Sequence, residues 1–150
     1  MKIALACDHG GLALKNIIAE YLTENGYEAV DFGTTTEESC DYPDFALHAA
    51  EAVKNGECER GIFVCTTGIG ISIAANKIPG IRCALCTDVV CARLTREHND
   101  ANVLALGGGV VGESLALDIV KTFLETPFSH LEKHQRRIDK IAAIERKYMK

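Results

Sequence analysis

Short runs of β-branched and apolar residues alternate along the chain with longer segments in which apolar residues recur every three or four positions. The first pattern is typical of buried strands and the second of amphipathic helices. The sequence predicts strands at Lys2–Cys7, Glu28–Phe32, Gly61–Cys65, Ile81–Leu85 and Val103–Leu106. It predicts helices at 12–26, 42–56, Gly70–Asn76, Asp88–His98 and Gly112–Glu125. This alternation favours an α/β fold in which a parallel sheet is covered by helices on both faces.

A last predicted helix, at 131–148, has no strand of its own to cover. Its apolar residues form one stripe among many charges, at Ile138, Ile141, Ala142 and Tyr148. The stripe must pack either on the domain's own surface or on another subunit, and we favour another subunit. With 150 residues, of which 47% are hydrophobic, residues 1–150 are expected to form a single domain.

Charge and cysteine content limit the possible partners and compartment. A net charge of −5 argues against nucleic acid and anionic membranes, because both bind basic surfaces. The first apolar run meets Asp8 and His9 at once, which is unlike a signal peptide or a membrane span. Seven cysteines, an odd number, favour free thiols in the cytoplasm. Cys83 and Cys86 form a CxxC pattern without a second pair at zinc-like spacing, so buried thiols are favoured over a metal site.

Candidate chemistry gathers after the predicted strands, where open parallel sheets bind their ligands. Asp8 and His9 follow the first strand, Cys65 to Gly70 the third, and three glycines the fifth. We expect His98 and Asn99, which precede the fifth strand, to lie at the same edge. Gly68 and Gly70 would turn backbone N–H groups towards an oxyanion or a phosphate at the start of a helix.

Cys65 ends a strand at this glycine turn. The positive end of the following helix would favour its thiolate, which is the form that acts as a base or nucleophile. A strand-end cysteine is more often buried and inert, so Cys65 alone leaves both interpretations open, while Asp8, His9 and His98 favour a functional one. Dinucleotide binding is the weaker alternative, because Ile73 replaces the third glycine of the GxGxxG pattern.

Several long motifs, in order, resemble the ribose-5-phosphate isomerase B family of sugar-phosphate isomerases, whose relatives include galactose-6-phosphate isomerase subunits. The motifs are IALACDHGG, DYPDFA, CTTGIGISIAANKIPGIRCAL, REHNDANVLALGGGVVG and HQRRIDKI. The resemblance implies a three-layer α/β/α, doubly wound (Rossmann-like) domain with five parallel strands and an extra C-terminal helix. It implies no metal or organic cofactor, and a homodimer or dimer of dimers whose sites are shared between subunits.

The resemblance also implies a reaction, the interconversion of ribose 5-phosphate and ribulose 5-phosphate through a cis-enediolate. By position, Cys65 would be the base, and His98 would open the furanose ring with Asp8 and Thr67 nearby. The remaining implied substrate contacts are the enediolate hole of Gly68, Ile69, Gly70 and Asn99, the sugar contacts Asp8 and Tyr42, the loop residue Thr66, and the phosphate ligands His9, Lys133 and Arg137.

Three residues depart from the usual pattern of that family. Thr66 replaces a glycine and would be strained if the position required a positive φ. Gly109 replaces an arginine, and Lys133 stands where an arginine is usual. The lost cation keeps open a six-carbon substrate, such as allose or galactose 6-phosphate. A non-catalytic nucleotide- or phosphate-binding module and a regulatory relative without activity are the further alternatives.

Overall fold

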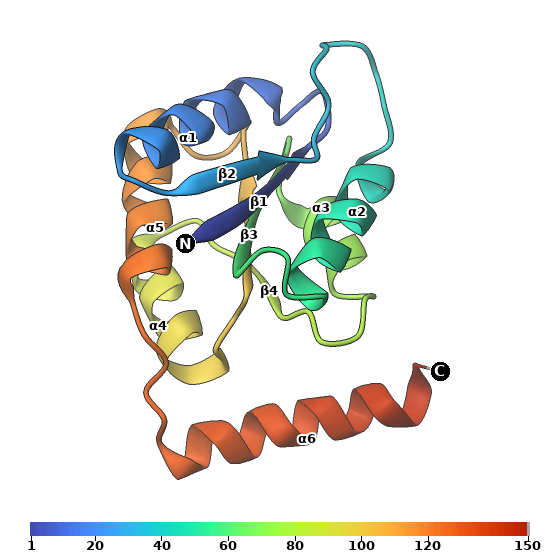
Figure 1. Ribbon diagram of the computed structural model, residues 1–150, viewed down its shortest axis with the longest axis vertical. Helices are drawn as coiled ribbons and strands as arrows, with labels where there is room; N and C mark the ends of the chain where they lie inside the picture. Colours follow the sequence, from blue (N-terminus) through green and yellow to red (C-terminus); the bar gives the residue numbers. More distant parts are fainter. Residues whose placement is uncertain (150) are drawn as a thin grey trace.

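The structure, a computed structural model, describes residues 1–149 and contains a parallel five-stranded sheet between two layers of helices (Figure 1). The strands are β1 (Lys2–Cys7), β2 (Glu28–Asp31), β3 (Arg60–Cys65), β4 (Cys83–Leu85) and β5 (Val103–Gly107), in the order β2-β1-β3-β5-β4. The predicted fold class is therefore confirmed. Strand β4 begins at Cys83 instead of Ile81, because the Arg82 amide donates to the Asn102 side chain, at 2.8 Å, instead of extending the strand.

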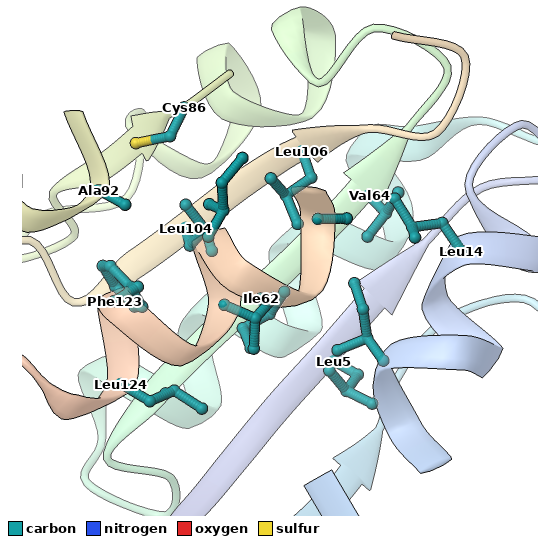
Figure 2. Close-up of a cluster of buried hydrophobic side chains, with 14 of the residues drawn as sticks. Leu5, Leu14, Ile62, Val64, Cys86, Ala92, Leu104, Leu106, Phe123 and Leu124 are labelled. Atoms are coloured by element: carbon teal, nitrogen blue, oxygen red, sulfur yellow. The ribbon is translucent and has the colours of Figure 1, made fainter. Parts of the chain in front are cut away.

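The helices cover both faces of the sheet, as the alternating pattern predicted (Figure 1). They are α1 (Leu12–Glu24), α2 (Tyr42–Lys54), α3 (Ile69–Ala75), α4 (Val89–Asn99), α5 (Glu113–Glu125) and α6 (Glu132–Tyr148). Helices α1, α4 and α5 pack over one face, where Leu5, Ile62 and Leu104 of the sheet and Phe123 of α5 belong to one buried cluster (Figure 2). Helices α2 and α3 pack over the other face, which contains Cys65. None of the helices in residues 1–149 has the length and apolar content needed to cross a membrane.

Small residues on the second face allow α2 to lie close to the sheet. Alternate residues of a strand point to opposite faces, and in β1 this places Ala4 and Ala6 beneath α2. The helix meets them with alanines of its own, Ala46, Ala49 and Ala50, all fully buried. This close packing sets the position of Tyr42, the first residue of α2, beside the carboxyl edge of the sheet.

Lys15 on α1 is a buried cation with only 2% of its side chain exposed. Its Nζ donates to Asp31 Oδ2, at 2.5 Å, and to the carbonyl oxygen of Thr34, at 3.3 Å. Asp31, at the end of β2, remains 39% exposed. The ion pair therefore joins α1 to the edge strand β2, with the Lys15 side chain buried and the Asp31 side chain in contact with water.

Helix α6 extends along one end of the molecule, away from the two helical layers (Figure 1). Its His134 and Ile138 are buried, and Gly80 N–H donates to Glu145 Oε1 at 2.8 Å, so the helix docks on its own domain. Of the predicted apolar stripe, Ile138 is covered by its own domain, while the packing of the remaining residues on another subunit stays a prediction. Further along the helix Ile141, Ile144 and Tyr148 are 48%, 62% and 72% exposed.

Candidate active site

Cys65 ends β3 at the carboxyl edge of the sheet, and its thiol is fixed by the turn that follows. The Gly68 N–H donates to Cys65 Sγ at 3.1 Å. Gly68 has φ 78, a conformation that glycine adopts without strain, and an added Cβ would lie 2.8 Å from the backbone of Leu106. An N–H directed at the sulfur stabilises negative charge there. The predicted glycine turn is therefore present, and its first amide faces the thiol.

Two adjoining pockets open at this edge. One, of about 350 Å³, is lined by Asp8, Tyr42, Cys65, Thr66, Thr67, Ile69 and Gly70. The other, of about 540 Å³, is lined by Asp8, His9, Cys40, Asp41, Tyr42, Pro43 and Asp44. Asp8 and Tyr42 border both pockets, so the residues predicted after β1 and β3 are brought together with the start of α2.

Asp8 and Tyr42 are held by different means. The Asp8 carboxyl is buried, and its Oδ1 accepts from the N–H groups of Gly10 and Gly11, at 3.0 and 3.1 Å, at the start of α1. Tyr42 lies against the backbone of Gly70, where an added Cβ would be 2.5 Å from Cζ of the phenol ring. Gly70 is therefore needed for the approach of Tyr42, a role that the glycine pattern alone did not reveal.

The backbone amides of the predicted anion hole are partly engaged within the loop. Gly68 N–H contacts Cys65 Sγ, and Ile69 N–H donates to Thr67 Oγ1 at 3.2 Å. In this structure the Gly68 amide faces the Cys65 sulfur, and the role of the loop amides in holding an enediolate oxygen stays a prediction. Thr66 adopts no positive φ, so the strain considered for this position is absent.

His9 has a neighbour that the sequence did not indicate. The Cys40 N–H donates to His9 Nδ1 at 3.3 Å, and Cys40 Sγ lies 3.8 Å from the same nitrogen. Because Nδ1 accepts this bond, the neutral ring carries its proton on Nε2. Cys40 lies in the irregular segment between β2 and α2, where no periodicity marks the contact.

His98 and Asn99 lie at the opposite end of the sheet from Cys65, contrary to the expectation that they share its edge. They are the last two residues of α4, which leads into the amino end of β5. At this amino end the Gly61 N–H of β3 donates to the carbonyl oxygen of Asn102 at 2.9 Å. Cys65 instead pairs with Gly107. The four residue steps of β5 between these ends span about 13 Å at the usual strand rise.

A second cluster surrounds His98 at this amino end. Its ring lies 4.3 Å from that of His134, between centroids, with a tilt of 35°. His134 Nδ1 is 2.6 Å from Ser129 Oγ. Burial, and then the charges of His98, Lys133 and Arg137, lower the pKa of His134. The predicted ring-opening histidine and the predicted phosphate-binding cations of α6 are thus close together, and all are separated from Cys65.

The charges of the two ends are complementary. Among the described residues that line the two pockets, Asp8, Asp41 and Asp44 carry carboxyl groups, and there is no lysine or arginine. The cations of α6 lie at the other end of the same chain. In residues 1–149 no three His, Cys, Asp or Glu side chains are grouped so that they could hold a metal ion.

Comparison with known proteins gives consistent matches over nearly the whole chain. Residues 3–141 match the family described as Ribose/Galactose Isomerase. Ribose-5-phosphate isomerase B of Escherichia coli (strain K12) is 48% identical over 146 residues, which cover 97% of each chain. A solved structure of Clostridium thermocellum ribose-5-phosphate isomerase B has a TM-score of 0.97 at 60% identity, with 99% of each chain covered. That of Mycoplasma genitalium, with bound ribulose-5-phosphate, has a TM-score of 0.91 at 43% identity, covering 97% of this chain and 96% of that one.

Proposed function

Because this chain belongs to the Ribose/Galactose Isomerase family, we propose that it interconverts ribose 5-phosphate and ribulose 5-phosphate. The observation that carries the proposal is the thiol of Cys65, held 3.1 Å from the Gly68 amide at the border of a pocket lined also by Asp8 and Tyr42. A fixed thiol beside groups that can bind hydroxyls suits proton transfer between neighbouring carbons. The similarity to ribose-5-phosphate isomerase B of two other organisms supports the choice of substrate.

In the proposed mechanism Cys65 acts as a thiolate base. It removes the proton from C2 of the open-chain aldose, which leaves a cis-enediolate, and returns that proton to C1 while the C2 oxygen becomes the ketone. The hydroxyl proton passes from O2 to O1. Asp8, Tyr42 and Thr67 bind the sugar hydroxyls, and His9 approaches the phosphate. Each of these roles falls to a side chain, and the proposed mechanism uses no metal ion or organic cofactor.

The remaining groups come, in this proposal, from a second copy of the chain. His98 would open the furanose ring, Asn99 would hold the enediolate oxygen, and Lys133 and Arg137 would bind the phosphate. Support comes from their separation from Cys65 in one chain and from the acidic lining of the pockets, in which a phosphate would otherwise meet carboxylates. The exposed apolar residues of α6 fit the same arrangement, a homodimer or a dimer of dimers with two-fold symmetry.

Mixing two inactive variants tests both the chemistry and the sharing of the site. Cys65→Ala and His98→Ala should each be nearly inactive when alone. Refolded together, they form mixed dimers in which one site carries both substitutions and the other carries neither. Random pairing makes half of the dimers mixed, so roughly a quarter of the wild-type activity should return. A mixture that stays as inactive as its components contradicts the shared site, and full activity of Cys65→Ala alone contradicts the proposed base.

A six-carbon sugar phosphate remains the second candidate substrate, favoured by one observation. Gly109 is exposed in the loop after β5, where this family usually carries an arginine, and no long side chain projects from the position. The ratio of kcat/KM for ribose 5-phosphate to that for allose 6-phosphate decides between the two. A ratio well above one supports the pentose assignment.

We also propose the cytoplasm as the compartment of this enzyme. All seven cysteines are free thiols. Reduced cysteines are typical of proteins in reducing compartments. Cell fractionation with an antibody against the chain would test the assignment.

A further inference from the structure

His134 is a buried histidine that the proposed chemistry does not use. Only 6% of it is exposed, although it lies on α6, whose neighbouring positions face the solvent. Its ring lies 4.3 Å from that of His98, which is itself exposed in the last turn of α4. A polar ring is normally buried at a surface helix only when its hydrogen bonds are satisfied. Here one of its nitrogens is 2.6 Å from Ser129 Oγ.

Ser129 links the two histidines through hydrogen bonds to α4 and to the start of α6. Ser129 N–H donates to the carbonyl oxygen of Glu97, at 3.2 Å, and Glu97 precedes His98 on α4. Ser129 Oγ accepts from Leu131 N–H, at 3.2 Å, and contacts His134 Nδ1. The ring of His134 in turn packs against the ring of His98, which belongs to α4. Ser129 and His134 are therefore fixed relative to the turn of α4 that carries His98.

We propose that His134 is a positioning residue for His98, and that Ser129 holds it in the orientation required for this role. The inference rests on the proposed function, in which His98 opens the furanose ring in the partner's pocket. An exposed histidine has two freely rotating side-chain torsions, and a fixed ring face beside it limits the orientations that it can adopt. The alignment needed for proton transfer is then present before the substrate arrives.

The electrostatics of His134 suit a neutral ring in this place. Burial lowers its pKa, and the charges of His98 on α4 and of Lys133 and Arg137 on α6 act in the same direction, while Glu97 opposes them. A neutral ring beside His98 adds no second positive charge when His98 takes up a proton. His134 can therefore orient its neighbour without opposing the protonated form that a ring-opening acid needs.

A pair of assays separates ring opening from proton transfer at carbon. Ribulose 5-phosphate cannot form a furanose ring, because its C5 hydroxyl is esterified. The exchange of its C1 hydrogen with D₂O, followed by NMR, therefore needs Cys65 but no ring opening. Turnover of ribose 5-phosphate, which is cyclic in solution, needs both steps. His98→Ala should lower the second rate far more than the first.

The variants of His134 should show the same pattern as His98→Ala, a selective loss of ribose 5-phosphate turnover, but the loss should be smaller. We expect His134→Ala to lower kcat for ribose 5-phosphate roughly 10- to 100-fold, with C1 exchange and KM within about threefold of wild type. His134→Phe restores the flat ring and should recover part of the loss. Ser129→Ala releases the ring without removing it and should give a smaller loss in the same direction. Ile138→Ala, which removes another buried side chain of α6, is the matched control and should change both rates equally, if at all.

The outcomes are distinguishable. If exchange and turnover fall together in the His134 variants, or if Ile138→Ala reproduces their pattern, His134 serves only the docking of α6 and the inference is overturned. If His98→Ala slows ribose 5-phosphate selectively while all His134 and Ser129 variants behave as wild type, the inference fails and the proposed function stands. If His98→Ala has no selective effect, the inference fails together with the ring-opening role of His98, whereas the isomerase activity itself is tested by Cys65→Ala. Should His134→Ala not fold, as judged by circular dichroism, His134→Phe and Ser129→Ala still give the answer.

Discussion

Thr66 and Gly109 are in direct backbone contact, because Gly109 N–H donates to the carbonyl oxygen of Thr66 at 2.8 Å. A Cβ on Gly109 would lie 3.1 Å from both Thr66 Cγ2 and that oxygen. Both residues lie in loops that follow strands, Thr66 after β3 and Gly109 after β5. They differ from the usual residues of the family, which are glycine at position 66 and arginine at position 109. The contact indicates that the two departures are coupled, because the threonine methyl occupies space that a side chain at 109 would need.

This coupling predicts a double-mutant effect. We expect Gly109→Arg alone to improve phosphate binding little, because its Cβ is crowded. Combined with Thr66→Gly, the arginine should lower KM for ribose 5-phosphate roughly tenfold, the value of a charge-assisted hydrogen bond. Steady-state kinetics on both single variants and the double variant measure the coupling. Val110→Arg adds a cation at the next position, which is 57% exposed, and is the control. Strictly additive effects would contradict the coupling.

Loss of the Cys65 thiol should abolish turnover without loss of the fold. We expect Cys65→Ala to lower kcat by about 10²- to 10⁴-fold, the usual contribution of a general base, while ribose 5-phosphate still binds. Coupled assays in both directions and calorimetric titration measure the two quantities. Cys58→Ala, which removes another buried thiol, at 2% exposure, should retain wild-type kcat. Equal losses in the two variants would show that Cys65 matters only for packing.

The ion pair between Lys15 and Asp31 should respond asymmetrically to substitution. Asp31→Ala leaves a buried ammonium group without its partner, so the free energy of unfolding should fall by about 3–5 kcal/mol. Lys15→Met should cost less, because Asp31 is 39% exposed and can be solvated. Urea denaturation measures both. Lys2→Met breaks the exposed pair with Glu28 and should change stability by about 1 kcal/mol or less. A larger loss in Lys15→Met than in Asp31→Ala would contradict this account.

Stability should fall as the solution is acidified past the ordinary pKa of histidine, partly through His134. Its pKa in the folded chain is lowered from 6.5, chiefly by burial, so the unfolded state binds more protons than the folded state in that range. The stability that His134 contributes is fully present above pH 6.5 and is lost as the pH falls from 6.5 through the pKa of the folded state. Urea unfolding of wild type and His134→Phe, from about pH 8 to about pH 5, gives the difference in slope. Parallel curves would show that His134 does not titrate on unfolding.

The exposed apolar end of α6 predicts a link between association and activity. Ile144→Asp places a charge on a residue that is 62% exposed in one chain and, in the proposed dimer, is covered. We expect weaker association in sedimentation experiments and a specific activity that falls on dilution. Leu115→Asp on α5 changes a residue of similar exposure, 41%, on another part of the surface and serves as the control. Unchanged sedimentation of Ile144→Asp would exclude this end of α6 from the interface.

The regular elements could be predicted from the sequence because apolar spacing follows burial directly. The strand and helix positions agree to within two residues, and the deviation at β4 arises from the Asn102 side chain, a tertiary contact that no local pattern records. The groups around Cys65 were also predictable, since carboxyl ends of parallel strands share one edge. The same rule was misapplied to His98 and Asn99, because residues that precede a strand lie at its amino end. The contact between Cys40 and His9 joins two irregular segments and had no sequence signal.

The alanine layer between α2 and β1 bears on how the substrate range of this enzyme could be altered in the laboratory. Ala49 and Ala50 are fully buried against the sheet, and overpacking a core shifts backbone elements. A slightly larger residue at Ala49 or Ala50 would therefore lift α2 and move Tyr42 away from Gly70. Variant libraries directed at these buried positions, remote from any substrate atom, would widen the pocket while its polar groups keep their identity.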